Sequence, residues 1–425
     1  MQNPLNKTFI RVNYLIYLLF IFSTGRAQDQ TNDSLKSLLV SSIDSILNSQ
    51  VSANKIPGAV IQVKQGGQIV YNNAYGYAQM YDDWHIFLPE PEKMNMNTLF
   101  DLASLTKVIA TTTGIMLLVD QGKLSVDDPV SRFLPAFGSR DKKDMRIRHL
   151  LTHTAGLYEW YPLYYISTNK KSTFELIDIL PLKYPIGKGR HYSDLGFVLL
   201  GEIIETISGL SLEQFVQQNI FLPLGMNHTL FNPKTKGRVS NIAATSFGNP
   251  YEKRMVHDST LGFQIKGLDP DHWNGWRTYL LKGEVNDGNA WYANGGISGA
   301  AGLFSTISDL QILVDMLLNK GRASGKQFIS ESTIGLFLAM DGFKNGLGWM
   351  MDPENSFMKN APPGSFGHTG FTGTSIVVVP QYRLSIILLI NRQHEGLQPT
   401  GDYYNVGPIR QQIFETVIKY CRKGQ

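Results

Sequence analysis

The stretch Phe100-Asp101-Leu102-Ala103-Ser104-Leu105-Thr106-Lys107 stands at the head of a run of apolar residues with helical spacing. The pattern predicts a helix that carries Ser104 in its first turn and Lys107 one turn later. Residues at i and i+3 share a face, so the amine can reach the hydroxyl. A serine hydroxyl is a weak nucleophile that needs a base, and a lysine partly removed from water can serve as one. The helix N-terminus adds N–H groups that favour a developing oxyanion. On its own, Ser-x-x-Lys also fits a solvated pair without a function.

Two further segments strengthen the functional interpretation. Gly-Arg-His-Tyr-Ser-Asp-Leu-Gly occupies residues 189–196, just before an apolar helix. A tyrosine beside a cationic lysine can have its pKa lowered and act as a general base, so Tyr192 is a candidate, although it also fits a buried aromatic. Gly-His-Thr-Gly-Phe-Thr-Gly-Thr-Ser occupies residues 367–375 and leads into a β-branched run. Such a small-residue strand lets a substrate backbone lie alongside it, or it forms a tight edge-strand turn.

The ordered trio of Ser-x-x-Lys, Tyr-Ser-Asp and His-Thr-Gly resembles the motifs of the serine β-lactamase and penicillin-binding-protein superfamily. The chain is most similar to the branch with class C β-lactamases, D-Ala-D-Ala carboxypeptidases and related esterases. Segments 148–157, 223–226 and 299–305 match this branch as well, and the resemblance covers nearly all of residues 35–420.

The resemblance implies a role for each matching residue. Ser104 would attack the acyl carbon, while Lys107 and Tyr192 would move the proton from its hydroxyl to the leaving group. The backbone N–H groups of Ser104 and Phe371 would form the oxyanion hole, and water would release the acyl-enzyme. The residues that would line the substrate-holding strand are His368, Thr369 and Gly370.

Two positions depart from the commonest family pattern. Asp194 stands where the Tyr motif usually has Asn, and a carboxylate near Lys107 would favour the ammonium form and leave more of the work to Tyr192. His368 stands where the strand motif usually has Lys, so a fixed positive charge for a substrate carboxylate is weakened. Both changes argue against an efficient β-lactamase.

The function expected from this resemblance is a secreted serine hydrolase, with a D-Ala-D-Ala carboxypeptidase or D-peptidase and an esterase as close rivals. A β-lactamase and a binding module that traps its ligand on Ser104 without releasing it are the alternatives. The partner is expected to be a small molecule or a peptidoglycan peptide. No metal-binding histidine spacing occurs, so no metal or other cofactor is expected. The segment 284–287 and Asn289 are candidates for substrate recognition, although loop capping is the simpler interpretation.

Strand-like segments at both chain ends predict an α+β fold, with an antiparallel sheet built from the two ends and flanked by helices. A mainly helical insertion is expected about residues 101–304, between sheet-containing parts about residues 28–100 and 305–425. Long loops that line the site are expected about residues 232–300. The expected strands are residues 59–64, 68–77, 373–379 and 384–391, and the expected terminal helices have apolar stripes at residues 35–47 and 409–421.

Residues 1–27 combine Lys7 and Arg11, a short apolar run and a small-x-small site that ends at Ala27. These features predict a cleaved signal peptide. The mature protein is therefore expected to be secreted or periplasmic, without a stable membrane anchor. Its loss would lower the net charge from +4 to about +1, and no basic-aromatic pattern supports nucleic-acid binding. Cys421, the only cysteine, excludes an internal disulfide and is expected to be a buried apolar residue.

Overall fold

The computed structural model describes residues 34–138, 140–238, 240–354 and 357–423, so the predicted signal peptide at residues 1–27 lies outside the described residues. A six-stranded antiparallel sheet forms the centre, with strand order β3-β2-β1-β11-β10-β9. Its strands, in that order, are Phe87–Lys93, Gln68–Tyr81, Gly58–Gln65, Leu384–Ile390, Ser375–Val379 and Phe366–Thr369. The predicted α+β fold is confirmed.

The sheet joins the two chain ends because β1 pairs with β11, with Ala59 opposite Ile390. Each of these strands belongs to a predicted hairpin. Gly66 and Gly67 connect β1 to β2 with positive φ angles of 59° and 88°, which suit the twist of a tight hairpin. A short turn that ends at Arg383 connects β10 to β11.

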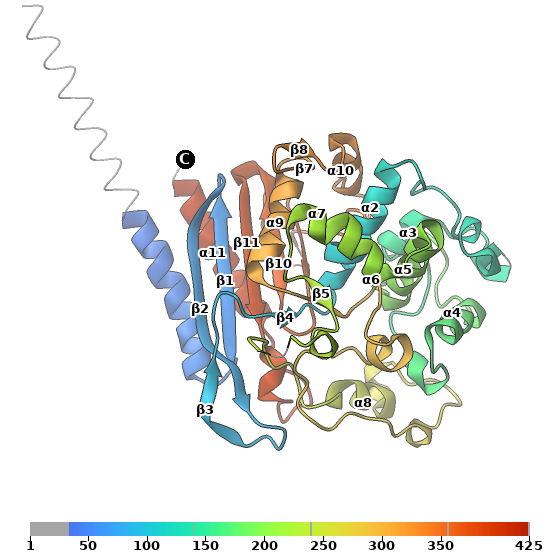
Figure 1. The fold of residues 1–425 in the computed structure, drawn as a ribbon, viewed down its shortest axis with the longest axis horizontal. Helices are drawn as coiled ribbons and strands as arrows, with labels where there is room; N and C mark the ends of the chain where they lie inside the picture. The colour runs from blue at the N-terminus through green and yellow to red at the C-terminus, as the bar shows by residue number, and fades with distance from the viewer. Residues whose placement is uncertain (1–33, 139, 239, 355–356, 424–425) are drawn as a thin grey trace, which may run out of the picture.

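Two helices cover one face of the sheet (Figure 1). They are the helix of residues 34–52 and α11, Gly407–Lys423. Ile43 and Val417 are fully buried in the core between these helices and the sheet. Cys421 is buried there too, as expected. Leu38 contradicts the predicted stripe, because it is 55% exposed and its helix position faces water.

The other helices lie on the opposite side of the sheet, where they enclose the larger core (Figure 1). They are α2 Thr113–Asp120, α3 Ile147–Leu151, α4 Lys170–Ile179, α5 Asp194–Ser208, α6 Leu212–Val216, α7 Leu222–Leu224, α8 Pro250–His257, α9 Ile307–Leu318 and α10 Glu331–Phe337. Two small sheets complete the fold, one of β4 Phe100–Asp101, β6 Leu303–Ser305 and β5 Leu230–Phe231, the other of β7 Arg322–Ala323 and β8 Lys326–Gln327.

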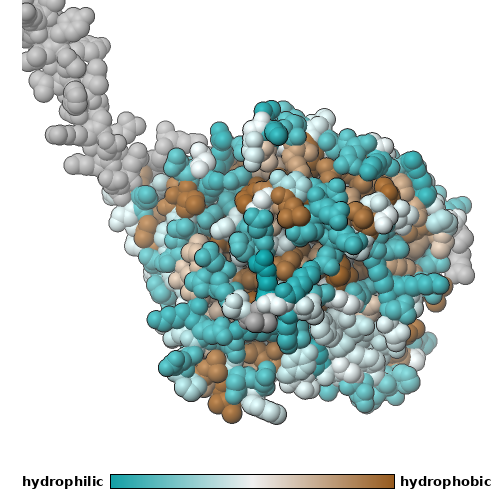
Figure 2. Space-filling model, in the orientation of Figure 1, coloured by the Kyte–Doolittle hydropathy of each residue, from teal (hydrophilic) through white to brown (hydrophobic). Residues whose placement is uncertain are grey.

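The surface in Figure 2 shows hydrophobic residues in separate groups among hydrophilic ones. In the described part of the chain, no single helix is both long and apolar enough to cross a membrane. One bent pair of helices, Asp194–Ser208 with Leu212–Leu224, is long and apolar enough when the two helices are counted together. The interior of α5 is buried in the larger core, which accounts for its apolar composition.

Helix α8 lies inside the predicted loop region and was not predicted from the sequence. Pro250 occupies its first turn, where the missing N–H costs nothing. This local start signal was present in the sequence, but the helix has only eight residues and two buried ones, Met255 and Val256. Most of residues 232–300 outside α8 forms turns and short helical turns, as expected for loops.

Candidate active site

Ser104 lies at a sharp turn between strand β4 and a helix. Asp101 at the end of β4 pairs with Phe304 of β6, which anchors the strand. Ala103 then adopts a φ angle of 46°, in the left-handed region that a residue with a Cβ rarely occupies. The π-helical turn Lys107–Thr112 and α2 follow, and all six residues of that turn are buried. The turn therefore presents Ser104 at the start of a fixed helix, as predicted.

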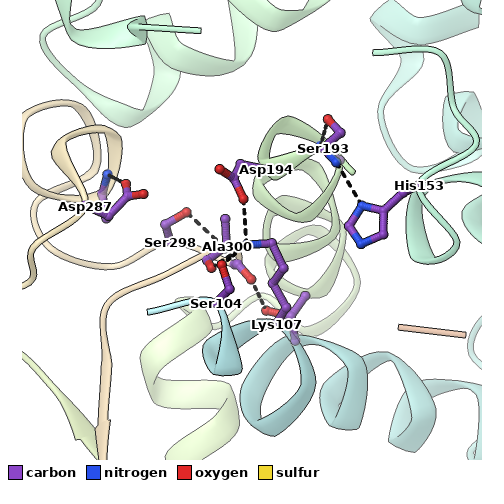
Figure 3. A network of polar contacts seen from close by, with 12 residues as sticks. Ser104, Lys107, His153, Ser193, Asp194, Asp287, Ser298 and Ala300 are labelled. Atoms are coloured by element: carbon purple, nitrogen blue, oxygen red, sulfur yellow. Dashed lines mark hydrogen bonds and ion pairs between the residues drawn. The ribbon is translucent and has the colours of Figure 1, made fainter. Parts of the chain in front are cut away.

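The Lys107 amine is buried below Ser104, with 1% of the side chain exposed. Its Nζ donates to Ser104 Oγ at 3.0 Å and to the Ala300 carbonyl oxygen at 2.9 Å. It also forms an ion pair with Asp194 Oδ1 at 2.7 Å. Figure 3 shows these three contacts converging on the amine. The spacing of Ser104 and Lys107 therefore brings the two groups into direct contact.

The neighbours of Lys107 decide its charge. Burial is the largest effect and would lower the pKa of the amine, but the contributions of Asp194, Tyr192 and Asp287, with Asp194 foremost, together outweigh burial and hold this pKa above its ordinary value. Lys107 is therefore an ammonium group at neutral pH in the resting protein, which is the effect expected from Asp in place of Asn.

Tyr192 lies beside the same amine, with Lys107 Nζ 5.2 Å from the centre of its ring. The ring of His153 packs against Tyr192 at 4.4 Å between ring centres, and His153 Nδ1 accepts from the Ser193 N–H at 3.0 Å. Burial raises the pKa of Tyr192, and the lowering effect of Lys107 does not cancel it. The predicted lowering of this pKa is thus wrong, because the sequence did not show how far the phenol is removed from water.

The 367–375 segment lies against the nucleophile turn. Gly370 is required there, because a Cβ would overlap the carbonyl oxygen of Leu102. His368 is buried with Nδ1 2.9 Å from the Thr369 carbonyl oxygen, and burial next to Lys107 lowers the pKa of His368 to about 3. The imidazole is therefore neutral, in agreement with the expected loss of a fixed charge.

The two backbone groups expected to form the oxyanion hole are both free of protein acceptors. Within the described residues, neither the Ser104 N–H nor the Phe371 N–H donates to another protein atom. Phe371 is 40% exposed and lines the same cavity as Ser104. Two N–H groups without protein acceptors beside the same cavity fit an oxyanion hole. The role of these two groups in catalysis stays a prediction.

A cavity of about 290 Å³ opens over Ser104. Its lining combines apolar and aromatic side chains with four carboxyl groups. The residues are Ala103, Ser104, Glu159, Trp160, Tyr192, Asp194, Tyr251, Glu252, Met255, Phe263, Asn286, Asp287, Ala301 and Phe371. None of these described lining residues is Lys or Arg. His368, Thr369 and Gly370 are likewise absent from this lining, so their predicted substrate contacts stay a prediction.

The carboxyl groups that line the cavity differ in the groups that donate hydrogen bonds to them. Glu159 accepts from Lys183 Nζ at 2.8 Å, so its charge is paired. Glu252 accepts from the Gly288 N–H at 2.7 Å, and Asp287 accepts from the Ala290 N–H at 2.7 Å. Burial raises the pKa of both Glu252 and Asp287, and the Asp287 charge raises that of Glu252 further. The described residues include no group of three or more His, Cys, Asp or Glu side chains placed to hold a metal ion.

The family model named Beta-lactamase matches residues 43–408. The chain belongs to the Beta-lactamase family. It is 35% identical over 398 residues to the N-acetylmuramyl-L-alanine amidase of Bacillus subtilis (strain 168), covering 86% of each chain. It is 34% identical over 360 residues to a putative D-alanyl-D-alanine carboxypeptidase of Escherichia coli (strain K12), covering 80% of this chain and 79% of that one.

Solved structures share the fold of this Beta-lactamase family member at lower identity. The hydrolase EstCE1 superimposes with a TM-score of 0.65 at 21% identity, covering 90% of this chain and 99% of that one. A class C beta-lactamase superimposes with a TM-score of 0.65 at 20% identity, covering 90% and 98%. The predicted resemblance to the serine β-lactamase and penicillin-binding-protein superfamily is thus confirmed.

Several cavity residues of this Beta-lactamase family protein were missed by sequence reasoning. Trp160 and Glu159 come from the loop after α3, and Tyr251 and Glu252 come from α8. Asn286 and Asp287, by contrast, belong to the segment 284–287 that was a candidate for substrate recognition, and both line the cavity. Asp287 also accepts from the Ala290 N–H, so the loop-capping interpretation holds for this residue as well. No local motif marks the missed residues, because long-range packing alone brings their segments together.

Replacing Asp194 with Asn is expected to shift the pH dependence of kcat to lower pH. The raised pKa of Lys107 keeps the amine protonated to higher pH, so the rate of the native protein rises as the solution becomes more alkaline. The amide removes the Asp194 charge, which is the foremost of the causes that raise this pKa, so the pH at which the rate rises should fall by about one pH unit or more. Hydrolysis of p-nitrophenyl acetate across the pH range measures it, with Asp315→Asn, which removes a remote partner of Lys64, as the control. Superimposable profiles for native protein and D194N would contradict this assignment.

Proposed function

We propose that this protein is a serine amidase that cleaves the amide bond between N-acetylmuramic acid and L-alanine in peptidoglycan fragments, through an acyl-enzyme on Ser104. The observation that carries the hydrolase chemistry is the contact of 3.0 Å between Lys107 Nζ and the Oγ of Ser104, which lines the cavity. A serine with a buried amine at this distance has the proton relay that a nucleophile needs.

The proposed reaction proceeds in two steps. Ser104 Oγ attacks the lactyl carbonyl carbon, and its proton passes through the Lys107 and Tyr192 pair to the alanine nitrogen as the amide bond breaks. The Ser104 and Phe371 N–H groups stabilise the oxyanion. Water then attacks the ester, its proton returns to Ser104 Oγ, and the carboxylic acid leaves. Both relay groups are protonated at rest, so one proton must first be lost, which makes the reaction faster at alkaline pH.

The residues that line the cavity favour a substrate amide with no free carboxylate beside it over the substrate of a D-Ala-D-Ala carboxypeptidase. A D-Ala-D-Ala carboxypeptidase must hold a free carboxylate beside the bond it breaks, and a cation usually provides this contact. The described lining has four carboxyl groups and no Lys or Arg. Lys107 is paired with Asp194, and His368 is neutral. The lactyl carbonyl of N-acetylmuramic acid has no adjacent carboxylate, and the Bacillus subtilis relative carries the name of this activity.

We also propose that the protein acts outside the cytoplasm, in the periplasm or as a secreted protein. The predicted signal peptide at residues 1–27 supports export, and peptidoglycan fragments occur in the same compartment.

Four substrates separate the candidate activities. The protein is incubated with N-acetylmuramyl-L-alanyl-D-isoglutamine, with diacetyl-L-Lys-D-Ala-D-Ala, with a chromogenic cephalosporin and with p-nitrophenyl acetate, and products are followed by chromatography and mass spectrometry. Release of L-Ala-D-isoglutamine from the first substrate, lost in Ser104→Ala, is the expected result. Release of D-Ala from the second substrate alone would replace the amidase proposal with a carboxypeptidase, and cephalosporin turnover alone with a β-lactamase. Ser104-dependent cleavage of p-nitrophenyl acetate alone would indicate an esterase.

A further inference from the structure

We propose that Asp101 is a positioning residue. It fixes where both oxyanion donors, the N–H groups of Ser104 and Phe371, lie relative to the residues that line the cavity. This inference rests on the proposed acyl-enzyme chemistry and concerns a side chain outside the three motifs. Asp101 lies three residues before Ser104, at the end of β4, and is 3% exposed.

The Asp101 carboxylate first fixes the nucleophile turn. Its Oδ1 accepts from the Ala103 N–H at 2.9 Å, a local turn in which an aspartate bonds the backbone two residues ahead. Ala103 has a φ angle of 46°, a conformation that costs energy for a residue with a Cβ and persists only when its surroundings impose it. This bond supplies part of that restraint and therefore sets the direction of the Ser104 N–H.

The second carboxylate oxygen reaches the cavity wall. Asp101 Oδ2 accepts from the Asn286 N–H at 2.7 Å, and both Asn286 and Asp287 line the cavity. The one carboxylate thus fixes the distance between the nucleophile turn and the opposite loop.

The backbone of the same turn holds the other oxyanion donor. Thr372 Oγ1 donates to the Asp101 carbonyl oxygen at 2.7 Å, and Thr374 Oγ1 donates to the Leu102 carbonyl oxygen at 3.1 Å. Thr372 directly follows Phe371, so the position of the Phe371 N–H depends on where Asp101 lies. The 101–103 turn is therefore the common support of both donors.

The two side-chain contacts explain why a carboxylate suits this position. Two N–H donors approach two different oxygens, and an ionised carboxylate offers an acceptor on each. An amide offers only one oxygen and would place an NH₂ group against the other N–H. Burial raises the pKa of Asp101 to about 6, partly offset by the two N–H donors, so the group is ionised at neutral pH.

The test is the substitution Asp101→Asn, measured as kcat per active site. Active sites are counted by exhaustive labelling with a fluorophosphonate, and turnover is followed with p-nitrophenyl acetate. We expect kcat per labelled site to fall about 10- to 100-fold, because small misplacements of catalytic groups have effects of this size. KM is expected to stay within about threefold, since the lost interaction acts in the transition state.

Asp82→Asn is the matched control. Asp82 Oδ1 also accepts two backbone N–H groups, those of Trp84 and Ile86 at 2.9 Å, but it does not line the cavity. Its kcat is expected to match that of the native protein. Thr372→Val, which keeps the side-chain shape and removes the hydroxyl donor, tests the same support from the other segment if D101N does not fold, and it too should lower kcat without raising KM.

Three results would overturn the inference. If D101N keeps the native kcat per labelled site and only the number of labelled sites falls, the role of Asp101 is purely structural. Native kcat in T372V would show that the Phe371 donor does not depend on the turn. If native protein and Ser104→Ala hydrolyse every substrate at equal rates, the proposed function itself fails and this inference fails with it.

Discussion

Ser104→Ala is expected to lower kcat by about 10⁴-fold or more, on both p-nitrophenyl acetate and N-acetylmuramyl-L-alanyl-D-isoglutamine. The alanine has no oxygen to attack the carbonyl carbon, while the cavity and the backbone donors remain. Because Ser104 Oγ accepts one hydrogen bond from Lys107, its loss should change the free energy of unfolding by only about 1 kcal/mol. Steady-state kinetics and urea unfolding measure the two effects.

The control for this variant is Ser45→Ala, on the exposed side of the helix at residues 34–52. It should leave both kcat and the unfolding midpoint at their native values. A kcat for Ser104→Ala within tenfold of the native value would exclude Ser104 as the nucleophile.

Lys107→Met is expected to lower kcat by about 10³-fold, within the range for loss of a general acid–base group. Methionine fills a similar volume but cannot accept or return the Ser104 proton. It also leaves Asp194, with 24% of its side chain exposed, without its cation, so the free energy of unfolding should fall by about 1–3 kcal/mol. The measurement is kcat per folded molecule, with the folded fraction taken from unfolding curves.

Lys142→Met separates the catalytic effect of a buried lysine from its structural effect. The Lys142 side chain is 2% exposed, and its Nζ donates to the Asp178 and Leu180 carbonyl oxygens, away from the cavity. This variant should lose stability comparably while keeping its native kcat. Equal losses of kcat per folded molecule in K107M and K142M would contradict the assigned role of Lys107.

The sheet was predictable because its inner strands have strong local signals. The Gly66-Gly67 turn and the β-branched runs near Val377 and Ile387 define two hairpins in the sequence itself. The outer strand β3 was not predicted, and β9 was expected only through the substrate-holding strand that the family resemblance implied at His368 and Thr369. β3 contains two prolines and no buried residue, and β9 has only four residues, so neither shows an alternating pattern.

The predicted catalytic groups lie together because Ser104 and Lys107 share one helical turn, and the family pattern placed Tyr192 and Phe371 beside them. The electrostatics were only partly predictable. The effect of Asp194 on Lys107 follows from residue identity, whereas the raised pKa of Tyr192 depends on burial, which only the fold determines. The cavity wall at Trp160 and Tyr251 depends on loop packing in the same way.

The role of Ser104 as nucleophile is tested most directly by observing the acyl group on Ser104 during turnover. The protein is mixed with p-nitrophenyl acetate, quenched in acid at successive times, digested and examined by mass spectrometry. We expect one acetyl group to appear on the peptide containing Ser104, to decline as substrate is exhausted, and never to form in Ser104→Ala. Ser104-dependent turnover with no acyl group on that peptide at any time, or an acyl group that never leaves, would contradict this expectation.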